Sequence, residues 1–217
     1  MLFPFSLFNE SHVNLSPHAF LIALCRARAP ILWIGLTHLL GVVVGIGMVH
    51  AHNSFALRSR DDLVGRAIKS DPIMISMLQG HALRAAFADF AGNLIVGAAP
   101  STVMGLSVVL PFPWVAYRGW IGGIVSVDDA HFSRLRDRGE RIYYLGVLLL
   151  QLIPYTLAGG TGVRLGLAFL FPKGRWGYEA GERWLGLPAE GVRDVCRIYV
   201  WIVPLFLIAS IIEFLAR

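Results

Sequence analysis

The stretch ILWIGLTHLLGVVVGIGMV, residues 31 to 49, decides the class of fold. It holds no Asp, Glu, Lys or Arg, and as a helix it would be about 28 Å long, close to the roughly 30 Å of a hydrocarbon core. The 217-residue chain is 56% hydrophobic and 15% charged, with a mean hydropathy of +0.62, whereas soluble domains are about a quarter charged. The sequence therefore predicts an all-α, polytopic α-helical integral membrane protein.

Further apolar runs follow at 85–125, 142–171 and 198–216. The first of these would reach about 60 Å as one helix, so a single straight span is excluded. Two short spans meeting near 97–102 fit best, and one long span followed by a re-entrant segment is the alternative. We expect about five transmembrane helices, with four to six allowed, plus short interfacial helices.

The chain is expected to form a single membrane domain, 1–217, in which polar segments connect the apolar runs. Residues 1–29 are expected to form an interfacial N-terminal segment in which Ser16-Pro17 opens a helix. Residues 50–84 and 172–196 are expected to be polar connections, the first holding one or two short amphipathic helices. The net charge of +5 favours contact with membrane lipids rather than nucleic acid, for which no motif is present.

The run LQLIPYTLAGGTGVRLGLAFLF, residues 150 to 171, carries an arginine, Arg164. A charge inside a span costs about 2.5–3.5 kcal/mol and is normally paired or functional. We expect the helix to break here, with Arg164 opening the second half and Asp89 as the nearest acidic partner; snorkelling to an interface is the alternative. The residues of the expected break are Pro154, Gly159, Gly160 and Gly162.

Other polar residues in the apolar runs need a role. Asp89 and Asn93 share a helix face because they are four residues apart, and interhelical hydrogen bonding or an ion or proton path would explain them. His38 could hold a haem or chlorophyll, against the simpler prediction of a satisfied or interfacial histidine. The intramembrane polar residues are Arg164, Asp89, Asn93, Arg118 and Tyr155.

No catalytic constellation is visible, since GxSxG, HExxH and P-loop motifs are all missing. We expect no enzyme, no metal site and no cofactor apart from the pigment or haem considered for His38. The stretch RWGYEAGERWLG, residues 175 to 186, sets Trp176, Tyr178 and Trp184 beside charges. This mixture is typical of partner-binding surfaces and equally of an aromatic belt at the membrane surface.

Three segments together resemble the stage II sporulation protein M family of bacterial and archaeal multi-span membrane proteins. They are AGNLIVGAA (91–99), AYRGWIGGI (116–124) and LIPYTLAGGTGVRLGLAFL (152–170), and the resemblance covers roughly residues 31–216. The family has Asn where this chain has Arg118, and a Pro-His-Gly-x-x-Glu segment whose His and Gly are Tyr155 and Thr156 in this chain, after Pro154. The resemblance implies a non-enzymatic membrane component that works inside a larger assembly.

Three functions remain open from the sequence. The first is a structural or accessory subunit that binds other membrane subunits in a bacterial inner (cytoplasmic) membrane. The second is a small transporter or channel component with a polar site at Arg164 and Asp89. The third is a pigment- or haem-binding subunit that uses His38.

Overall fold

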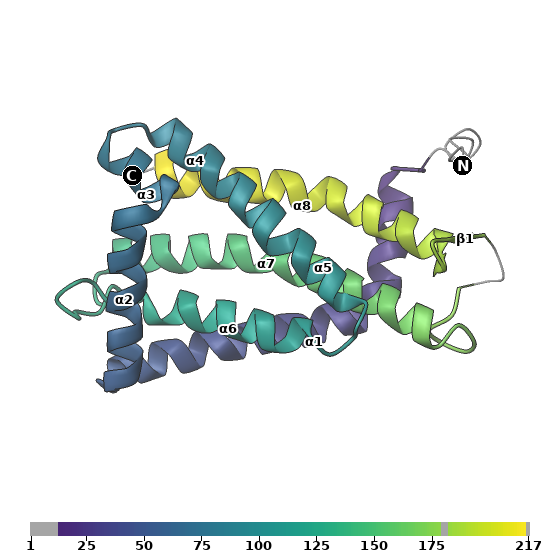
Figure 1. Ribbon diagram of the computed structural model, residues 1–217, viewed down its shortest axis with the longest axis horizontal. Helices are drawn as coiled ribbons and strands as arrows, with labels where there is room; N and C mark the ends of the chain where they lie inside the picture. The colour runs from purple at the N-terminus through teal and green to yellow at the C-terminus, as the bar shows by residue number, and fades with distance from the viewer. Residues whose placement is uncertain (1–12, 179–181, 216–217) are drawn as a thin grey trace.

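The computed structural model describes residues 13–178 and 182–215. In this part of the chain helices dominate, with one short β-hairpin (Figure 1). The elements are α1 (Pro17–His50), α2 (Ser54–Ser70), α3 (Pro72–Leu78), α4 (Ala82–Ala91), the π-helix η2 (Gly92–Ala98), α5 (Ala99–Gly105), α6 (Pro111–Ile124), α7 (Arg138–Leu170), β1 (Arg183–Trp184), β2 (Leu187–Pro188) and α8 (Ala189–Leu215).

Within the described residues, four helices are long and apolar enough to cross a membrane: α1, the continuous α4–η2–α5 segment, α7 and α8. Large apolar side chains on their outer faces are exposed, as expected where lipid surrounds a bundle. The predicted all-α membrane fold is confirmed. The predicted meeting of two spans near 97–102 is wrong, because one segment runs through to Gly105. The next helix, α6, has 14 residues and about 21 Å of length, short of a full span.

Helix α1 changes direction near Pro30, so its first turns lie across the bundle and the rest runs along it (Figure 1). The predicted helix start is confirmed: Ser16 caps α1 by accepting from Ala19 N, and Pro17 occupies the first helical position. Proline removes a backbone donor and crowds the preceding turn, which explains the bend. Residues 1–12 of the expected interfacial segment lie outside the described residues.

The bundle consists of two helix pairs with α7 between them, α1 with α6 and α4 with α8 (Figure 1). In the first pair Gly41 and Gly45 face Gly119 and Gly123, and a Cβ on Gly45 would lie 2.9 Å from Gly123 Cα. Small residues at four-residue spacing let membrane helices approach this closely. Within the described ranges α6 does not pack against α4 or α8. The two pairs therefore leave space between them.

The predicted helix break in α7 is wrong, because the helix is continuous from Arg138 to Leu170. Residues 154–166 are all buried, and the glycines serve close packing. A Cβ on Gly160 would lie 2.5 Å from Ile31 Cα, and one on Gly162 would lie 2.7 Å from Thr102 Cα. Gly159 faces the side chain of Ile34, whose Cγ2 would lie 3.1 Å from a Cβ there. These glycines bring α1 and α5 against α7.

The two polar connections differ in structure. Residues 50–84 hold the short helices α2 and α3, as predicted, and α2 crosses one end of the bundle (Figure 1). In 172–196 the last helix begins at Ala189 rather than near 198. Its first two turns are polar and carry several charges.

Candidate functional site

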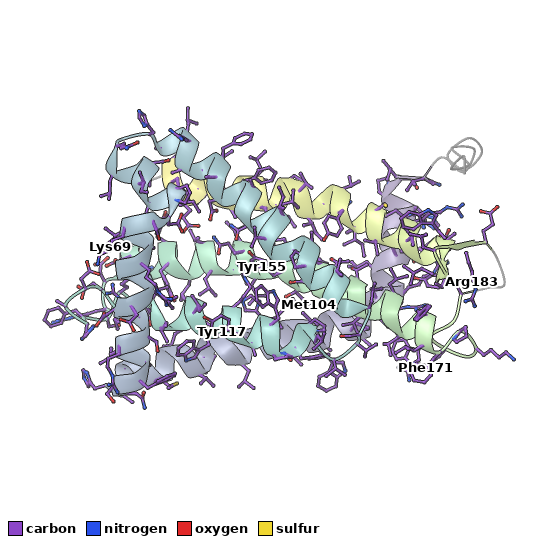
Figure 2. All side chains as sticks on the ribbon, in the orientation of Figure 1. Lys69, Met104, Tyr117, Tyr155, Phe171 and Arg183 are labelled. Carbon is purple, nitrogen blue, oxygen red and sulfur yellow. The ribbon has the colours of Figure 1, made fainter. Side chains whose placement is uncertain are left out.

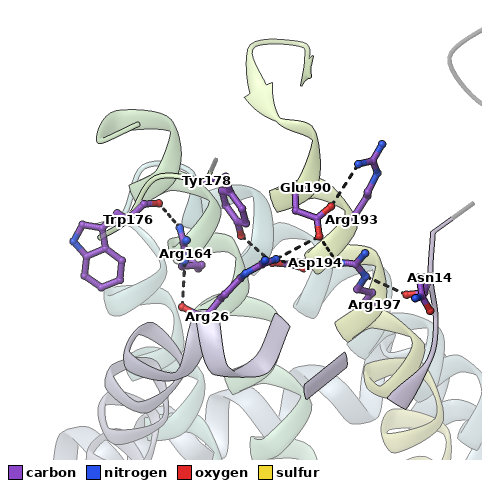
Figure 3. Close-up of polar contacts among 9 residues, drawn as sticks. All are labelled: Asn14, Arg26, Arg164, Trp176, Tyr178, Glu190, Arg193, Asp194 and Arg197. Atoms are coloured by element: carbon purple, nitrogen blue, oxygen red, sulfur yellow. Dashed lines mark hydrogen bonds and ion pairs between the residues drawn. The ribbon is translucent and has the colours of Figure 1, made fainter. Parts of the chain in front are cut away.

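Arg164 belongs to a set of charged and aromatic side chains at the end of the bundle where α8 begins, here called the arginine cluster (Figure 3). Arg164 is 5% exposed. Its Nε donates to Arg26 O at 3.2 Å, and its Nη1 donates to Trp176 O at 2.6 Å. The members of the cluster are Arg26, Arg164, Trp176, Tyr178, Glu190, Asp194 and Arg197.

The first of these bonds explains why the span contains an arginine. In a regular helix the carbonyl of Arg26 would accept from the N–H of the fourth residue on, which is Pro30 and has no N–H. The proline thus leaves this carbonyl without its helical donor, and Arg164 Nε supplies one. Arg164 therefore stabilises the bend of α1 from the neighbouring helix.

The remaining charges of the arginine cluster neutralise one another. Asp194, 2% exposed, pairs with Arg197 at 2.7 Å and with Arg26 at 3.1 Å. Glu190 pairs with Arg197 at 2.6 Å. Tyr178 OH donates to Asp194 at 3.1 Å. Burial, and then the negative charge of Asp194, raise the pKa of Tyr178, so this phenol stays protonated.

The cluster corrects one expectation. Arg164 contacts Arg26 and Trp176, and not Asp89, which bonds to Ser210 and Asn93 instead. Tyr178 lies under the Arg164 guanidinium, 4.5 Å from it to the ring centroid, so the structure gives this tyrosine an internal contact. Trp184 is 45% exposed at the β-hairpin and stays a candidate for partner binding.

A second group of polar residues surrounds a space of about 650 Å³ between the two helix pairs, here called the membrane cavity. It lies in the half of the bundle nearer α2, and Figure 2 shows Tyr155 and Tyr117 of its lining near the middle of the molecule. Its polar and aromatic lining residues are His38, Asp71, Asp89, Trp114, Tyr117, Arg118, Arg134, Glu140, Tyr143, Tyr144, Gln151, Tyr155, Glu213 and Phe214.

The wall from α1 and α6 supplies hydrogen-bond donors. Arg118 Nη2 donates to Tyr155 OH and, at 3.5 Å, to Asn93 Oδ1. It takes part in none of the ion pairs formed within the described ranges. Trp114 Nε1 and His38 Nδ1 are buried with no hydrogen-bond partner there. The predicted satisfied histidine is therefore wrong for this nitrogen of His38.

The opposite wall, from α4 and α8, supplies carboxylates. Asp89 Oδ2 accepts from Asn93 Nδ2 at 2.9 Å and from Ser210 Oγ at 2.7 Å. Glu213 Oε2 accepts from Gln151 Nε2 at 2.6 Å. The shared face of Asp89 and Asn93 and their interhelical bonding are thereby confirmed. The cavity has donors on one side and acceptors on the other.

Asn93 connects the two walls. Its amide donates to Asp89, and its Oδ1 accepts from Arg118 and from Tyr155. The π-helix begins one residue before Asn93, and π-helical turns inside α-helices are frequent at functional sites. Gly97 leaves room for the tyrosine ring, since a Cβ there would lie 2.9 Å from Tyr155 Cζ.

Helices α2 and α3 border the cavity at its outer end through Ala67, Asp71, Ile73, Met74 and Met77. Two contacts attach α2 to the loop after α6: an ion pair of Arg60 with Asp129 at 2.6 Å, and a hydrogen bond between Asp61 and His131 at 3.0 Å. Desolvation acts to raise the pKa of Asp61, but hydrogen bonds from His131 and Arg60 outweigh it and lower that pKa.

Sequence reasoning found five residues of the cavity and its bonding network, namely His38, Asp89, Asn93, Arg118 and Tyr155. It missed Trp114, Gln151, Ser210 and Glu213, although Gln151 and Glu213 are polar residues within apolar runs and could have been flagged. No three His, Cys, Asp or Glu side chains gather as metal ligands in the described ranges. Comparison with models of known families, with characterised proteins and with solved structures gives no match.

Proposed function

We propose that the protein binds a small polar solute in the membrane cavity and passes it across the bilayer, as a small transporter or channel component. The supporting observation is the cavity with an unpartnered indole N–H at Trp114, an unpartnered ring nitrogen at His38 and an arginine without a carboxylate. Buried polar groups without partners are costly, and a bound solute with acceptor atoms would satisfy them. The volume falls within the roughly 300–1,000 Å³ of ligand sites.

The proposal requires the cavity to contain water, and α7 offers a matched pair of positions. Leu148 lines the cavity, whereas the adjacent Leu149 is 56% exposed on the outer, lipid-facing surface. With the free cysteines Cys25 and Cys196 replaced by serine, Leu148→Cys should react with a charged, membrane-impermeant thiol reagent and Leu149→Cys should not. If neither cysteine reacts with the reagent, the cavity does not contain water.

Passage of solutes can be measured without knowing the substrate. Proteoliposomes are mixed with isosmotic small carboxylates, amines, amino acids and neutral polyols, and their swelling is followed by light scattering. We expect at least one charged class to enter faster than into empty liposomes, and Arg118→Gln to remove the difference. Arg175→Gln, an exposed arginine outside the cavity, is the control. Swelling no faster than in empty liposomes, for every solute, would overturn the proposal.

A second candidate function, an accessory subunit of a larger complex in a bacterial inner membrane, has its own support. Leu185 and Gly186 form the two-residue turn of the β-hairpin with positive φ angles, and Leu185 is 83% exposed. In addition, the three segments that resemble the stage II sporulation protein M family meet in space, because Asn93, Arg118 and Tyr155 bond to one another.

Size-exclusion chromatography of the protein from its own membranes tests this candidate. An accessory subunit should elute with other chains in a large particle, and Leu185→Asp should release it while leaving its own thermal unfolding unchanged. Elution of the wild type alone would contradict the role. Visible absorbance recorded on the same column, and its loss in His38→Leu, would test the pigment or haem hypothesis.

A further inference from the structure

We infer that the membrane cavity recognises a zwitterion, a molecule with an acidic group held by Arg118 and Trp114 and an ammonium group held by Asp89. This inference rests on the proposed function and specifies its substrate class. The two charges come from different helix pairs, Arg118 from α6 of the first and Asp89 from α4 of the second. Both line the same space.

The acid end is formed by a guanidinium without a carboxylate partner and an indole N–H without an acceptor. Arg118, which is half-buried, forms no ion pair within the described residues, whereas the buried Arg60 and Arg197 each pair with two carboxylates. Its guanidinium lies 5.9 Å from the ring centroid of Trp114, whose Nε1 has no partner. A planar guanidinium beside an indole N–H suits a carboxylate or phosphate oxygen.

The ammonium end is formed by Asp89. Both of its hydrogen bonds reach Oδ2, so Oδ1 accepts no hydrogen bond from the described residues. Glu213 and Asp71 line the same space and add negative charge around it. A carboxylate oxygen without a donor inside a membrane protein is a ready partner for an ammonium group.

Asn93 explains why these two charges do not simply neutralise each other. It donates to Asp89 and accepts from Arg118, so it lies between them and bonds to both. A ligand with one charge would satisfy one side and leave the other unmatched. A ligand with both charges satisfies both, as complementary sites require.

Two sources share this chemistry: a free amino acid and the headgroup of an aminophospholipid. They differ in their route of access, since a free amino acid enters from water and a headgroup enters from the bilayer. The binding experiment therefore uses a defined lipid without an amine, and a second arm adds one.

Equilibrium binding is measured by calorimetry on the full chain in phosphatidylglycerol nanodiscs. The probes are β-alanine, propionate and propylamine, which share a carbon skeleton and differ in charged ends. Because a charge-assisted hydrogen bond is worth about tenfold in affinity, we expect β-alanine to bind at least about tenfold more tightly than either single-charge probe. Glycine and γ-aminobutyrate then report the preferred spacing of the charges.

The variants separate the two ends. Asp89→Asn should bring β-alanine down to the affinity of propionate, and Arg118→Gln should bring it down to that of propylamine. Asp89→Asn is conservative, because asparagine retains a side-chain oxygen that accepts hydrogen bonds. The comparison of the three probes on the wild type does not depend on whether the variants fold. Propionate binding as tightly as β-alanine, unaffected by Asp89→Asn, would overturn the inference while leaving a solute-binding cavity in place.

Failure of the proposed function gives a different result, in which Leu148→Cys is unreactive and none of the probes binds. In the lipid arm, phosphatidylethanolamine is added to the nanodiscs. A fall in β-alanine affinity there assigns the zwitterion to a lipid headgroup, and an unchanged affinity assigns it to a free amino acid. Both results require that β-alanine has already bound more tightly than propionate.

Discussion

The arginine cluster and the membrane cavity both contain charges within membrane-spanning helices, but they treat those charges in opposite ways. In the cluster, Asp194 bonds to Arg26, Arg197 and Tyr178, and Arg164 bonds to two backbone carbonyls. In the cavity, Asp89 and Arg118 face the same space without pairing. A charged residue in a span is therefore not by itself a functional residue, and its partners decide between the two roles.

The difference has a physical cause in how the helices pack. Near the arginine cluster the glycines of α7 bring α1 and α5 into close contact with it. Towards α2 the two helix pairs separate, since α6 packs against neither α4 nor α8 in the described part of the chain. Charges in the closely packed half, at the arginine cluster, must pair with one another. Charges in the half with the membrane cavity can instead pair with a bound ligand.

The largest loss of stability is expected for Gly162→Ala, which pushes α5 and α7 apart. Its Cβ would lie 2.7 Å from Thr102 Cα on α5, so the helices must separate, and overpacking of this kind costs about 1–3 kcal/mol or more. Thermal unfolding in detergent measures it. Gly146→Ala in the same helix meets nothing within 4 Å and should be neutral or slightly stabilising, since alanine favours a helix over glycine. A stable Gly162→Ala protein would contradict close packing as the reason for the glycine.

Arg164→Leu should have the next largest effect, because it removes the donors to Arg26 O and Trp176 O in a buried place. Hydrogen bonds from charged groups contribute about 1.5–3 kcal/mol. Arg175→Leu, an exposed arginine in the loop after α7, is the matched control and should leave the unfolding temperature nearly unchanged.

A double-mutant cycle tests the reason given for Arg164. Pro30→Ala restores an N–H that can donate to Arg26 O, so Arg164→Leu should cost less in that background, by about 1 kcal/mol. Equal costs in both backgrounds would show that Arg164 does not act through the carbonyl that the proline leaves free.

These variants also mark how far the sequence alone could go. Apolar runs and the Ser16-Pro17 start predicted the membrane class and the first helix, since both depend on local composition. The four-residue spacing of Asp89 and Asn93 predicted their shared face for the same reason. The partner of Arg164 was out of reach, because it is a backbone carbonyl 138 residues away that only the bend at Pro30 makes available.

The glycines of α7 also depend on a neighbouring helix for their effect. Gly159, Gly160 and Gly162 weaken a helix in isolation, so the sequence predicts a break there. Contact with α1 and α5 reverses this preference, since only glycine allows the backbones to approach so closely. Sequence patterns describe one helix at a time and do not include the neighbour that decides the outcome.

Arg118→Gln, in the membrane cavity, should have a smaller effect on stability than Arg164→Leu, in the arginine cluster. Arg118 has a long bond to Asn93 and one to Tyr155, and removing an unpaired charge from a span offsets their loss. We expect a change within about 1 kcal/mol of the wild type in unfolding experiments without ligand. A loss as large as that of Arg164→Leu would place Arg118 among the structural charges.

The smallest effect concerns the attachment of α2 at the outer end of the cavity. The pKa of Asp61 is lowered by its bonds to His131 and Arg60, so its ionised form stabilises the fold above the unfolded-state pKa of about 3.9. That contribution is lost as the pH falls through the lower, folded-state value. Asp61 is 45% exposed, so the contribution is limited to a few tenths of a kcal/mol.

Unfolding of Asp61→Asn and the wild type, compared from pH 7 down to pH 3, measures this contribution. The variant should be slightly less stable at pH 7, and the difference should shrink as the pH falls below about 3.9 and the wild-type carboxylate begins to take up its proton. Asp62→Asn, at the exposed neighbouring position, should show no such convergence. A constant difference across this range would mean that the Asp61 charge does not hold α2, and that the cavity is bordered at this end by apolar packing of α2 and α3 alone.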